Sequence, residues 1–170
     1  LALGTGGIPR GDIIEIYGPP SYGKTTLALH LIAQAQQQGL RCLFLDMENG
    51  LNPSYAVRCG VKDQEMLLAR PFAGDDALEL CYTLLSERDI DLIVIDSIAA
   101  LAPREELLST QQTPQPGALN RLLSRYLRKL QQTCMGNQAT LFCTNQLRSR
   151  LRVGYGTPET TSAASPRRWS

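Results

Sequence analysis

The sequence predicts an α/β fold with a mostly parallel central sheet flanked by helices on both faces. Three observations support this prediction. Short runs rich in apolar and β-branched residues alternate with longer stretches of helical periodicity. The short runs are apolar at successive positions, which is typical of parallel strands covered on both faces. A glycine-rich segment joins the first run to the first helical stretch, as in a strand–turn–helix unit.

The elements follow from these patterns in chain order, and 170 residues suit a single domain. Strands are predicted at 12–17, 41–46, 66–70, 91–96 and 139–145. Helices are predicted at 24–38, 53–59, 75–87 and 119–133. Segments 103–117 and 147–165 are rich in turn-forming and polar residues and predict loops. Both are longer than most loops of compact domains, which favours binding loops or disordered segments.

Composition excludes several classes of protein. With 43% hydrophobic and 19% charged residues and no run of eighteen apolar residues, the chain is expected to be soluble and not membrane-bound. The N-terminus lacks the basic and apolar regions of a secretory signal. Five cysteines, without a C-x-x-C pair, favour buried reduced thiols in a cytoplasmic protein over disulfides or a zinc site.

Residues 18–25, GPPSYGKT, fit the pattern G-x-x-x-x-G-K-[ST] between a predicted strand and a predicted helix. Backbone N–H groups of such a loop, together with the helix N-terminus, form a cradle for phosphates. Lys24 would place a compact positive charge on the outer phosphates, and the Thr25 hydroxyl is suited to ligating Mg²⁺. The predicted nucleotide-binding residues here are Gly18, Pro19, Pro20, Ser21, Tyr22, Gly23, Lys24, Thr25 and Thr26.

Carboxylates follow two of the predicted strands, at the sheet edge where open α/β folds bind ligands. Asp96 ends DLIVID and is suited to holding Mg²⁺, although an aspartate in this position can also be a cap. Glu48 and Asp46 lie at the end of the second strand, and either could activate water for hydrolysis. Their spacing favours Glu48, because Asp46 also suits a turn at the strand end.

The chain resembles the ATPase core of the bacterial RecA recombinase family along nearly its whole length. The resemblance is carried by LGTGGIPRGDIIEIYGP, GKTTLALHLIAQAQQQG, LNPSYAVRCGV, LIVIDSIAALAP, TNQLR and GTPETT. It implies a P-loop NTPase with a RecA-like core over residues 1–170, using ATP and Mg²⁺, in which Glu48 polarises the attacking water. It also implies that Tyr55 stacks on adenine beside Asn52, and that Gln146 senses the γ-phosphate. Without the resemblance, Gln146 would be an ordinary polar residue at a strand end.

Charge is divided unevenly along the chain. Residues 1–120 carry 8 basic and 15 acidic side chains, whereas residues 121–170 carry 9 basic and one acidic. This asymmetry suggests a face that binds a polyanion. The helix at 119–133 has an apolar stripe, and off that stripe lies a basic ridge whose alternative reading is a solvated helix face. The ridge is formed by Arg121, Arg125 and Arg128.

The segment RSRLRVGYG, residues 148–156, places arginines at alternate positions and a tyrosine between glycines. Proteins that bind single strands with little sequence preference hold phosphates with such arginines and stack bases on aromatic rings. The resemblance implies that loops at 109–117 and 148–163 line the DNA channel of a helical filament. The residues expected to contact single-stranded DNA are Arg121, Arg128, Arg148, Arg150, Arg152 and Tyr155.

The chain departs from the family in several places. Tyr22 stands where relatives carry a small residue, and SAASPRRWS at 162–170 replaces a glycine pair and a strand. Counterparts of the family's N-terminal docking segment and C-terminal domain are absent from the sequence, as expected for a piece of a longer protein or a shortened paralogue. Helical filament formation is therefore expected of a full-length form more than of this chain.

Three classes of function are considered. The first is a DNA-dependent ATPase that pairs homologous strands in recombination and in the repair of DNA damage, including the SOS response. The alternative is a RecA-like accessory protein that binds recombinase or polymerase partners and hydrolyses little ATP. A P-loop kinase or helicase motor is a third class, to which the TNQLR and GTPETT segments give little support.

Overall fold

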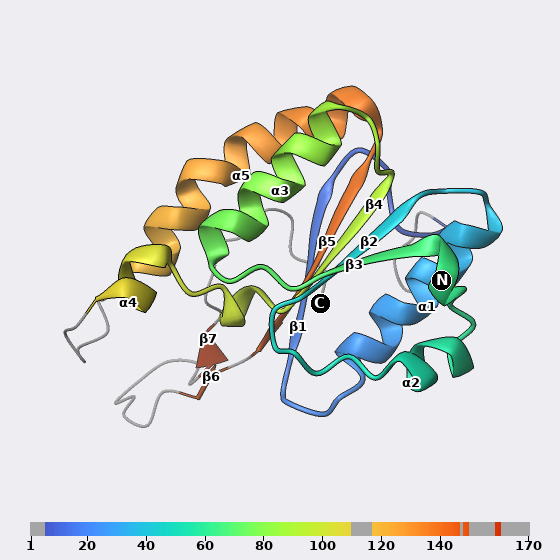
Figure 1. The fold of residues 1–170 in the computed structure, drawn as a ribbon, viewed down its shortest axis with the longest axis horizontal. Helices are drawn as coiled ribbons and strands as arrows, with labels where there is room; N and C mark the ends of the chain where they lie inside the picture. Colours follow the sequence, from blue (N-terminus) through green and yellow to red (C-terminus); the bar gives the residue numbers. More distant parts are fainter. Residues whose placement is uncertain (1–5, 110–116, 147, 150–158, 161–170) are drawn as a thin grey trace.

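A computed structural model describes residues 6–109, 117–146, 148–149 and 159–160. Figure 1 shows a twisted sheet with helices on both faces. Its strands are β1 (Ile13–Gly18), β2 (Cys42–Asp46), β3 (Met66–Ala69), β4 (Leu92–Asp96) and β5 (Thr140–Gln146). They stand in the order β1-β5-β4-β2-β3, and every neighbouring pair is parallel. The predicted fold class is confirmed, and each strand ends within one residue of its prediction.

The four predicted helices are also present. They are α1 (Lys24–Gln37), α2 (Pro53–Arg58), α3 (Gly74–Ser86) and α5 (Ala118–Asn137). Single 3₁₀ turns occur at η1 (Asp63–Glu65) and η2 (Ile98–Ala100).

Three short elements lie within the two segments predicted as loops, which corrects that prediction. Helix α4 (Arg104–Leu108) lies in the first predicted loop, and it forms because Arg104 N donates to Asp75 Oδ2 at 2.8 Å, which anchors its first turn to α3. The Gln-, Thr- and Pro-rich part of that loop, residues 110–116, lies outside the described residues. In the second, β6 (Arg148–Ser149) pairs antiparallel with β7 (Glu159–Thr160).

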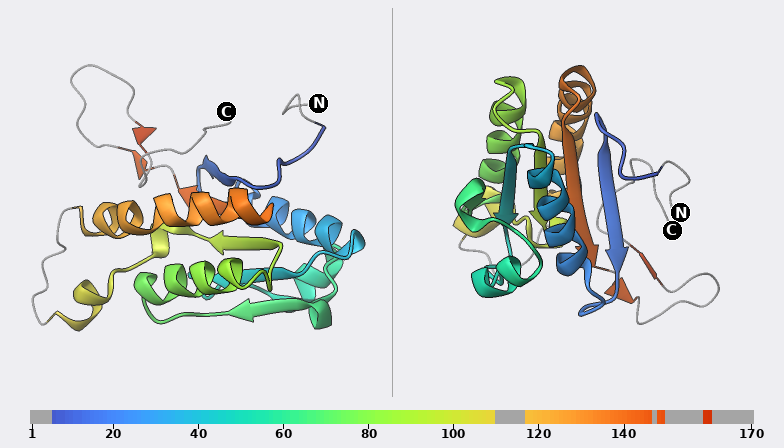
Figure 2. Two further views of the ribbon diagram at one scale, coloured as in Figure 1. Left: turned by 90° about the horizontal axis from the view of Figure 1, so that it is seen from above. Right: turned by 90° about the vertical axis from the view of Figure 1, so that its right-hand side faces the viewer.

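Alternate residues of the strands build two separate cores. Ile13 and Leu141 belong to the core beneath α3 and α5, whereas Ile14 and Phe142 belong to the core beneath α1 and α2. In Figures 1 and 2, α3 and α5 lie together on one side of the sheet, with α1 and α2 on the other. Burial on both faces explains why the strands are apolar throughout. All five cysteines are buried within these cores.

Helices α3 and α5 are in close contact. A Cβ atom on Gly74, the first residue of α3, would lie 2.9 Å from Leu122 Cδ2 and 3.2 Å from Leu101 Cβ, so a larger residue there would require these side chains to shift. The predicted apolar stripe of α5 faces the core, with Leu122, Leu123 and Leu130 buried. The stripe therefore decides which face of α5 is turned to solvent.

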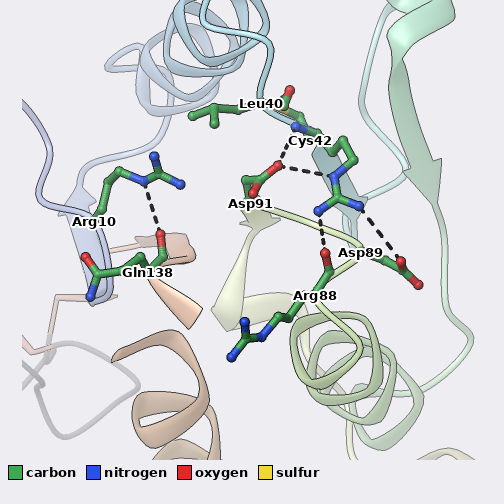
Figure 3. A network of polar contacts seen from close by, with 8 residues as sticks. Arg10, Leu40, Cys42, Arg88, Asp89, Asp91 and Gln138 are labelled. Atoms are coloured by element: carbon green, nitrogen blue, oxygen red, sulfur yellow. Dashed lines mark hydrogen bonds and ion pairs between the residues drawn. The ribbon is translucent and has the colours of Figure 1, made fainter. Parts of the chain in front are cut away.

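Polar contacts tie together the amino ends of the strands (Figure 3). Asp91 Oδ2 accepts hydrogen bonds from Arg41 N at 2.9 Å and Arg41 Nε at 3.3 Å, which joins the starts of β2 and β4. Arg10 Nε donates to Gln138 O at 3.1 Å, just before β5. These contacts are structural and lie at the sheet end opposite to the carboxyl ends of the strands. Within the described residues, no helix combines the length and the apolar character needed to cross a bilayer.

Candidate functional site

The carboxyl ends of four strands converge on one cavity. It has a volume of about 350 Å³, within the usual range for small-molecule sites. Gln146 ends β5, Asp96 ends β4, and Glu48 follows β2, while the turn after β1 contributes the remaining walls. The lining residues are Pro20, Ser21, Gly23, Lys24, Thr25, Thr26, Glu48, Asp96 and Gln146.

The turn between β1 and α1 is shaped as a cradle. Gly23 caps α1 in the left-handed conformation, with φ of 81°, which glycine adopts without steric cost. The first N–H groups of this fourteen-residue helix have no partner within the helix and face the turn. No acidic side chain lies in the first helical turn, so the positive end of the helix dipole is not neutralised there. Lys24 Nζ donates to two carbonyl oxygens of the same turn, Gly18 O at 3.1 Å and Pro19 O at 2.7 Å.

The Asp96 carboxylate accepts hydrogen bonds from two threonine hydroxyls, one of them on Thr25, the residue after Lys24. Thr25 Oγ1 donates to Asp96 Oδ2 at 2.6 Å, and Thr144 Oγ1 donates to the other carboxylate oxygen of Asp96. Hydroxyl and carboxylate oxygens are the ligands that Mg²⁺ prefers, usually together with water and phosphate oxygens. The donor set present therefore fits a magnesium ion at Thr25 and Asp96.

Glu48 is held by two donors inside the cavity. Ser97 Oγ donates to Glu48 Oε1 at 2.5 Å, and Gln146 Nε2 donates to the same oxygen at 3.0 Å. Ser97 directly follows Asp96, so both residues come from the end of β4. Both donors bond Oε1, so neither of them bonds the other carboxylate oxygen, Oε2.

Asp46 has a different environment. Its side chain is 3% exposed and accepts from Gly50 N at 3.0 Å, Leu51 N at 3.1 Å and Arg70 Nε at 3.0 Å. It does not line the cavity. These bonds hold the loop after β2, the loop that carries Glu48.

Tyr55 lies on α2 and contacts a residue of the cavity wall, and Asn52 is the N-cap of that helix. The Tyr55 hydroxyl is 2.8 Å from Thr26 Oγ1, which connects α2 to the start of α1. Asn52 Oδ1 caps α2 by accepting from Tyr55 N at 3.2 Å. The Arg58 guanidinium lies over one face of the Tyr55 ring, 5.7 Å from its centre.

Tyr22 is 79% exposed and lies outside the cavity lining. The tyrosine therefore leaves the cavity volume unobstructed. Pro19 contributes its carbonyl oxygen to Lys24 rather than a wall of the cavity.

The predicted DNA-contacting residues are only partly described. Arg121, Arg125 and Arg128 are exposed along α5, off its buried stripe. Arg148 begins β6. The other three predicted contacts lie outside the described residues: Arg150, Arg152 and Tyr155.

Sequence reasoning missed four polar residues that support the cavity. Ser97 donates to the Glu48 carboxylate, and Thr144 donates to the Asp96 carboxylate. Asn145 joins the buried Glu15 to the backbone of Gln146. A usable signal existed, since polar Thr144 and Asn145 close an otherwise apolar strand. Glu15 likewise interrupts the apolar run IIEIY.

The fold and the turn geometry define a P-loop protein with a RecA-like core. A family model described as the RecA N-terminal domain matches residues 1–168. The chain is 47% identical over 162 residues to Protein RecA of Chloroflexus aurantiacus and 46% identical over 165 residues to Protein RecA of Blastochloris viridis. These alignments cover 95% and 97% of the chain but 46% and 47% of the relatives' lengths. The chain belongs to the RecA family and spans about half the length of these relatives.

Proposed function

We propose that residues 1–170 are the ATP-hydrolysing core of a DNA-dependent ATPase that acts in homologous strand pairing and DNA repair. The observation that carries this proposal is the convergence of one ammonium group, one hydroxyl, two carboxylates and one amide on a single cavity. These groups belong to Lys24, Thr25, Glu48, Asp96 and Gln146.

Phosphate binding falls to the turn between β1 and α1. Lys24 Nζ bonds two backbone carbonyls of its own turn, and phosphate oxygens are stronger acceptors because they are charged. A bound triphosphate would replace the backbone carbonyls as the acceptor of hydrogen bonds from Lys24 Nζ. The N–H groups at the start of α1 would bond the inner phosphates. Mg²⁺ would be held by Thr25 and Asp96, and it would neutralise phosphate charge.

Glu48 is the better candidate for the base that activates water. It lines the cavity, whereas the Asp46 carboxylate already accepts three hydrogen bonds in a buried position. Asp46 is better suited to fixing the loop. Tyr55 lies close enough to the turn to contact a nucleotide base, with Asn52 holding the helix on which it is carried.

Gln146 would detect the γ-phosphate. Its side-chain amide bonds Glu48 in the structure, and a γ-phosphate within reach would compete for the same N–H group. Transfer of that bond would leave Ser97 as the remaining one of the two donors to Glu48 Oε1, and it would displace the end of β5. Because the chain runs directly from Gln146 into the arginine-rich segment, the displacement would reach the residues proposed to hold DNA.

Single-stranded DNA would bind the basic region, residues 121–170. Exposed Arg121 and Arg128 on α5 support this proposal, together with the arginines at 148, 150 and 152. Loops at 109–117 and 148–163 would line the DNA channel. Assembly of the whole protein into a filament and its action in the cytoplasm belong to the same proposal.

A second function rests on Tyr22. A tyrosine that is 79% exposed beside a nucleotide site is suited to contacting another protein, as in a RecA-like accessory protein with little ATPase activity. Titration with a fluorescent ATP analogue, with Mg²⁺ and then with a chelator, tests the shared first step. We expect tight binding that weakens without Mg²⁺. Absence of binding in both conditions would contradict the nucleotide site.

A further inference from the structure

Glu15 is a buried carboxylate that the proposed chemistry does not use. It lies in the middle of β1 and is 2% exposed. Its Oε1 accepts one hydrogen bond, from Asn145 Nδ2 at 2.6 Å. No donor in the described part of the chain reaches its other oxygen, Oε2.

The surroundings of Glu15 are otherwise apolar. It shares a face of the sheet with Ile13, and together with leucines of α5 it lines a small cavity of about 20 Å³. A carboxylate with a single partner in such a place reduces stability, whereas the apolar residues typical of β1 would not. Departures from the local pattern that carry such a cost are expected at functional positions.

The partner of Glu15 links it to the proposed sensor. Asn145 is completely buried, and while its Nδ2 donates to Glu15, its Oδ1 accepts from Gln146 N at 2.8 Å. Backbone pairing between β4 and β5 ends at Cys143, so beyond it the backbone of β5 pairs only with β1 among the described strands, and side-chain bonds from Thr144, Asn145 and Gln146 add to that hold.

Glu15 and Gln146 act from opposite faces of the sheet. Glu15 and Asn145 lie on the α5 side, whereas Gln146 reaches Glu48 in the cavity on the α1 side. The hydrogen bonds form a continuous path from Glu15 through Asn145 and the backbone of Gln146 to Glu48.

We propose that Glu15 is a positioning residue for Gln146. From the α5 side of the sheet, it fixes the position of Gln146 through Asn145. The inference rests on the proposed binding of ATP in the cavity. Without the Glu15 carboxylate, the Asn145 amide loses its acceptor and can turn, and the Gln146 N–H loses its fixed partner. The protein would then bind nucleotide normally but distinguish ATP from ADP poorly.

The test is the ratio of the dissociation constants for ADP and for a slowly hydrolysed ATP analogue, measured by titration in the full chain. In the unmodified protein the ratio should exceed about 5, the lower end of ordinary coupling between sites. Glu15→Leu should bring the ratio close to 1 while the Kd for ADP stays within about twofold, because the phosphate cradle is untouched. Glu15→Gln keeps an acceptor for Asn145 Nδ2 and should restore most of the ratio.

Ile13→Val is the matched control, since it weakens the same face of the same strand without touching Asn145. It should lower the unfolding temperature and leave the ratio unchanged. If Glu15→Leu does not fold, Asn145→Ala removes the same path with a smaller side chain and should give the same loss.

The possible failures are distinguishable. If the unmodified protein binds neither nucleotide, the proposed function is wrong. If it binds both with a ratio near 1, the sensor role of Gln146 is overturned together with this inference. A high ratio that survives Glu15→Leu or Asn145→Ala overturns the role of Glu15 alone.

Discussion

Gln146 Nε2 lies 3.0 Å from Glu48 Oε1, so the proposed sensor and the proposed base bond each other directly. Ser97 Oγ shares that oxygen at 2.5 Å. A ligand that takes the amide of Gln146 necessarily changes the hydrogen bonding of Glu48. In the proposed function, detection of the γ-phosphate and activation of water would thereby be linked through one carboxylate oxygen.

Lys24→Ala should abolish ATP binding, because the variant leaves the cradle with backbone donors and no ammonium group to neutralise a triphosphate. Titration with a fluorescent ATP analogue checks this. Lys62→Ala is the control, because Lys62 pairs with Glu65 on the surface. This variant should bind the ATP analogue like the unmodified protein. Equal affinity of the two variants would refute the role of Lys24.

Glu48→Gln should keep ATP affinity near normal and slow hydrolysis by roughly 10²–10⁴-fold, the usual contribution of a positioned base. The measurement is kcat together with the Kd for ATP. A loss of affinity as large as the loss of kcat would instead assign Glu48 to binding.

Asp46→Asn should mainly lower stability, by about 1–3 kcal/mol, since an amide cannot accept all three of the bonds to Gly50 N, Leu51 N and Arg70 Nε. Urea denaturation measures the change in unfolding free energy. If Asp46→Asn instead stopped hydrolysis in a folded protein that still binds ATP, Asp46 would be the base.

Affinity for single-stranded DNA should fall with salt, with a log–log slope of about −3 to −4 for roughly five phosphate contacts. Replacing Arg148, Arg150 and Arg152 with Ala should reduce that slope by about two. Tyr155→Ala should cost ~1–3 kcal/mol without changing the slope, because stacking releases no counterions. Arg88→Ala, before β4, is the control and should change neither. If the salt slope is unchanged when the three arginines are replaced, the basic segment does not hold DNA and is a solvated surface.

Stability should fall in alkali because burial raises the pKa of four thiols, those of Cys42, Cys81, Cys134 and Cys143. Burial raises the pKa of Cys42 to about 12 and that of Cys134 to about 12, with Asp91 and Asp12 adding to the two shifts, from an ordinary value of 9.0. The folded state keeps these protons while the unfolded chain releases them, so stability present below pH 9 is lost as pH rises toward 12.

Each thiol should cost about 1.4 kcal/mol per pH unit in that window. Urea denaturation at about pH 8 and about pH 10 measures the loss. A Cys42→Ala, Cys134→Ala double variant should show a shallower decline than the unmodified protein. Identical declines would mean that other groups account for the effect.

Sequence patterns could predict the sheet because its strands are covered on both faces, which makes Phe44, Val94 and Phe142 part of uninterrupted apolar runs. The turn at 18–25 could be predicted because its glycines and Lys24 have fixed spacing. Helix α4 could not, since a bond from Arg104 N to Asp75, distant in sequence, anchors it.

The supports of the site were also hidden from sequence reasoning. The bond between Glu15 and Asn145 joins residues 130 positions apart, and only the pairing of β1 with β5 brings them together. Asp46 and Glu48 looked alike in sequence, two residues apart after one strand. Their environments separate them, because Arg70 reaches Asp46 while Gln146 reaches Glu48.

The most direct test of the proposed function is steady-state ATP turnover by this chain with and without single-stranded DNA. Turnover should rise when DNA is added and should disappear in Glu48→Gln. Zero turnover in both conditions, from a folded chain that binds ATP, would contradict the ATPase proposal and favour an accessory protein.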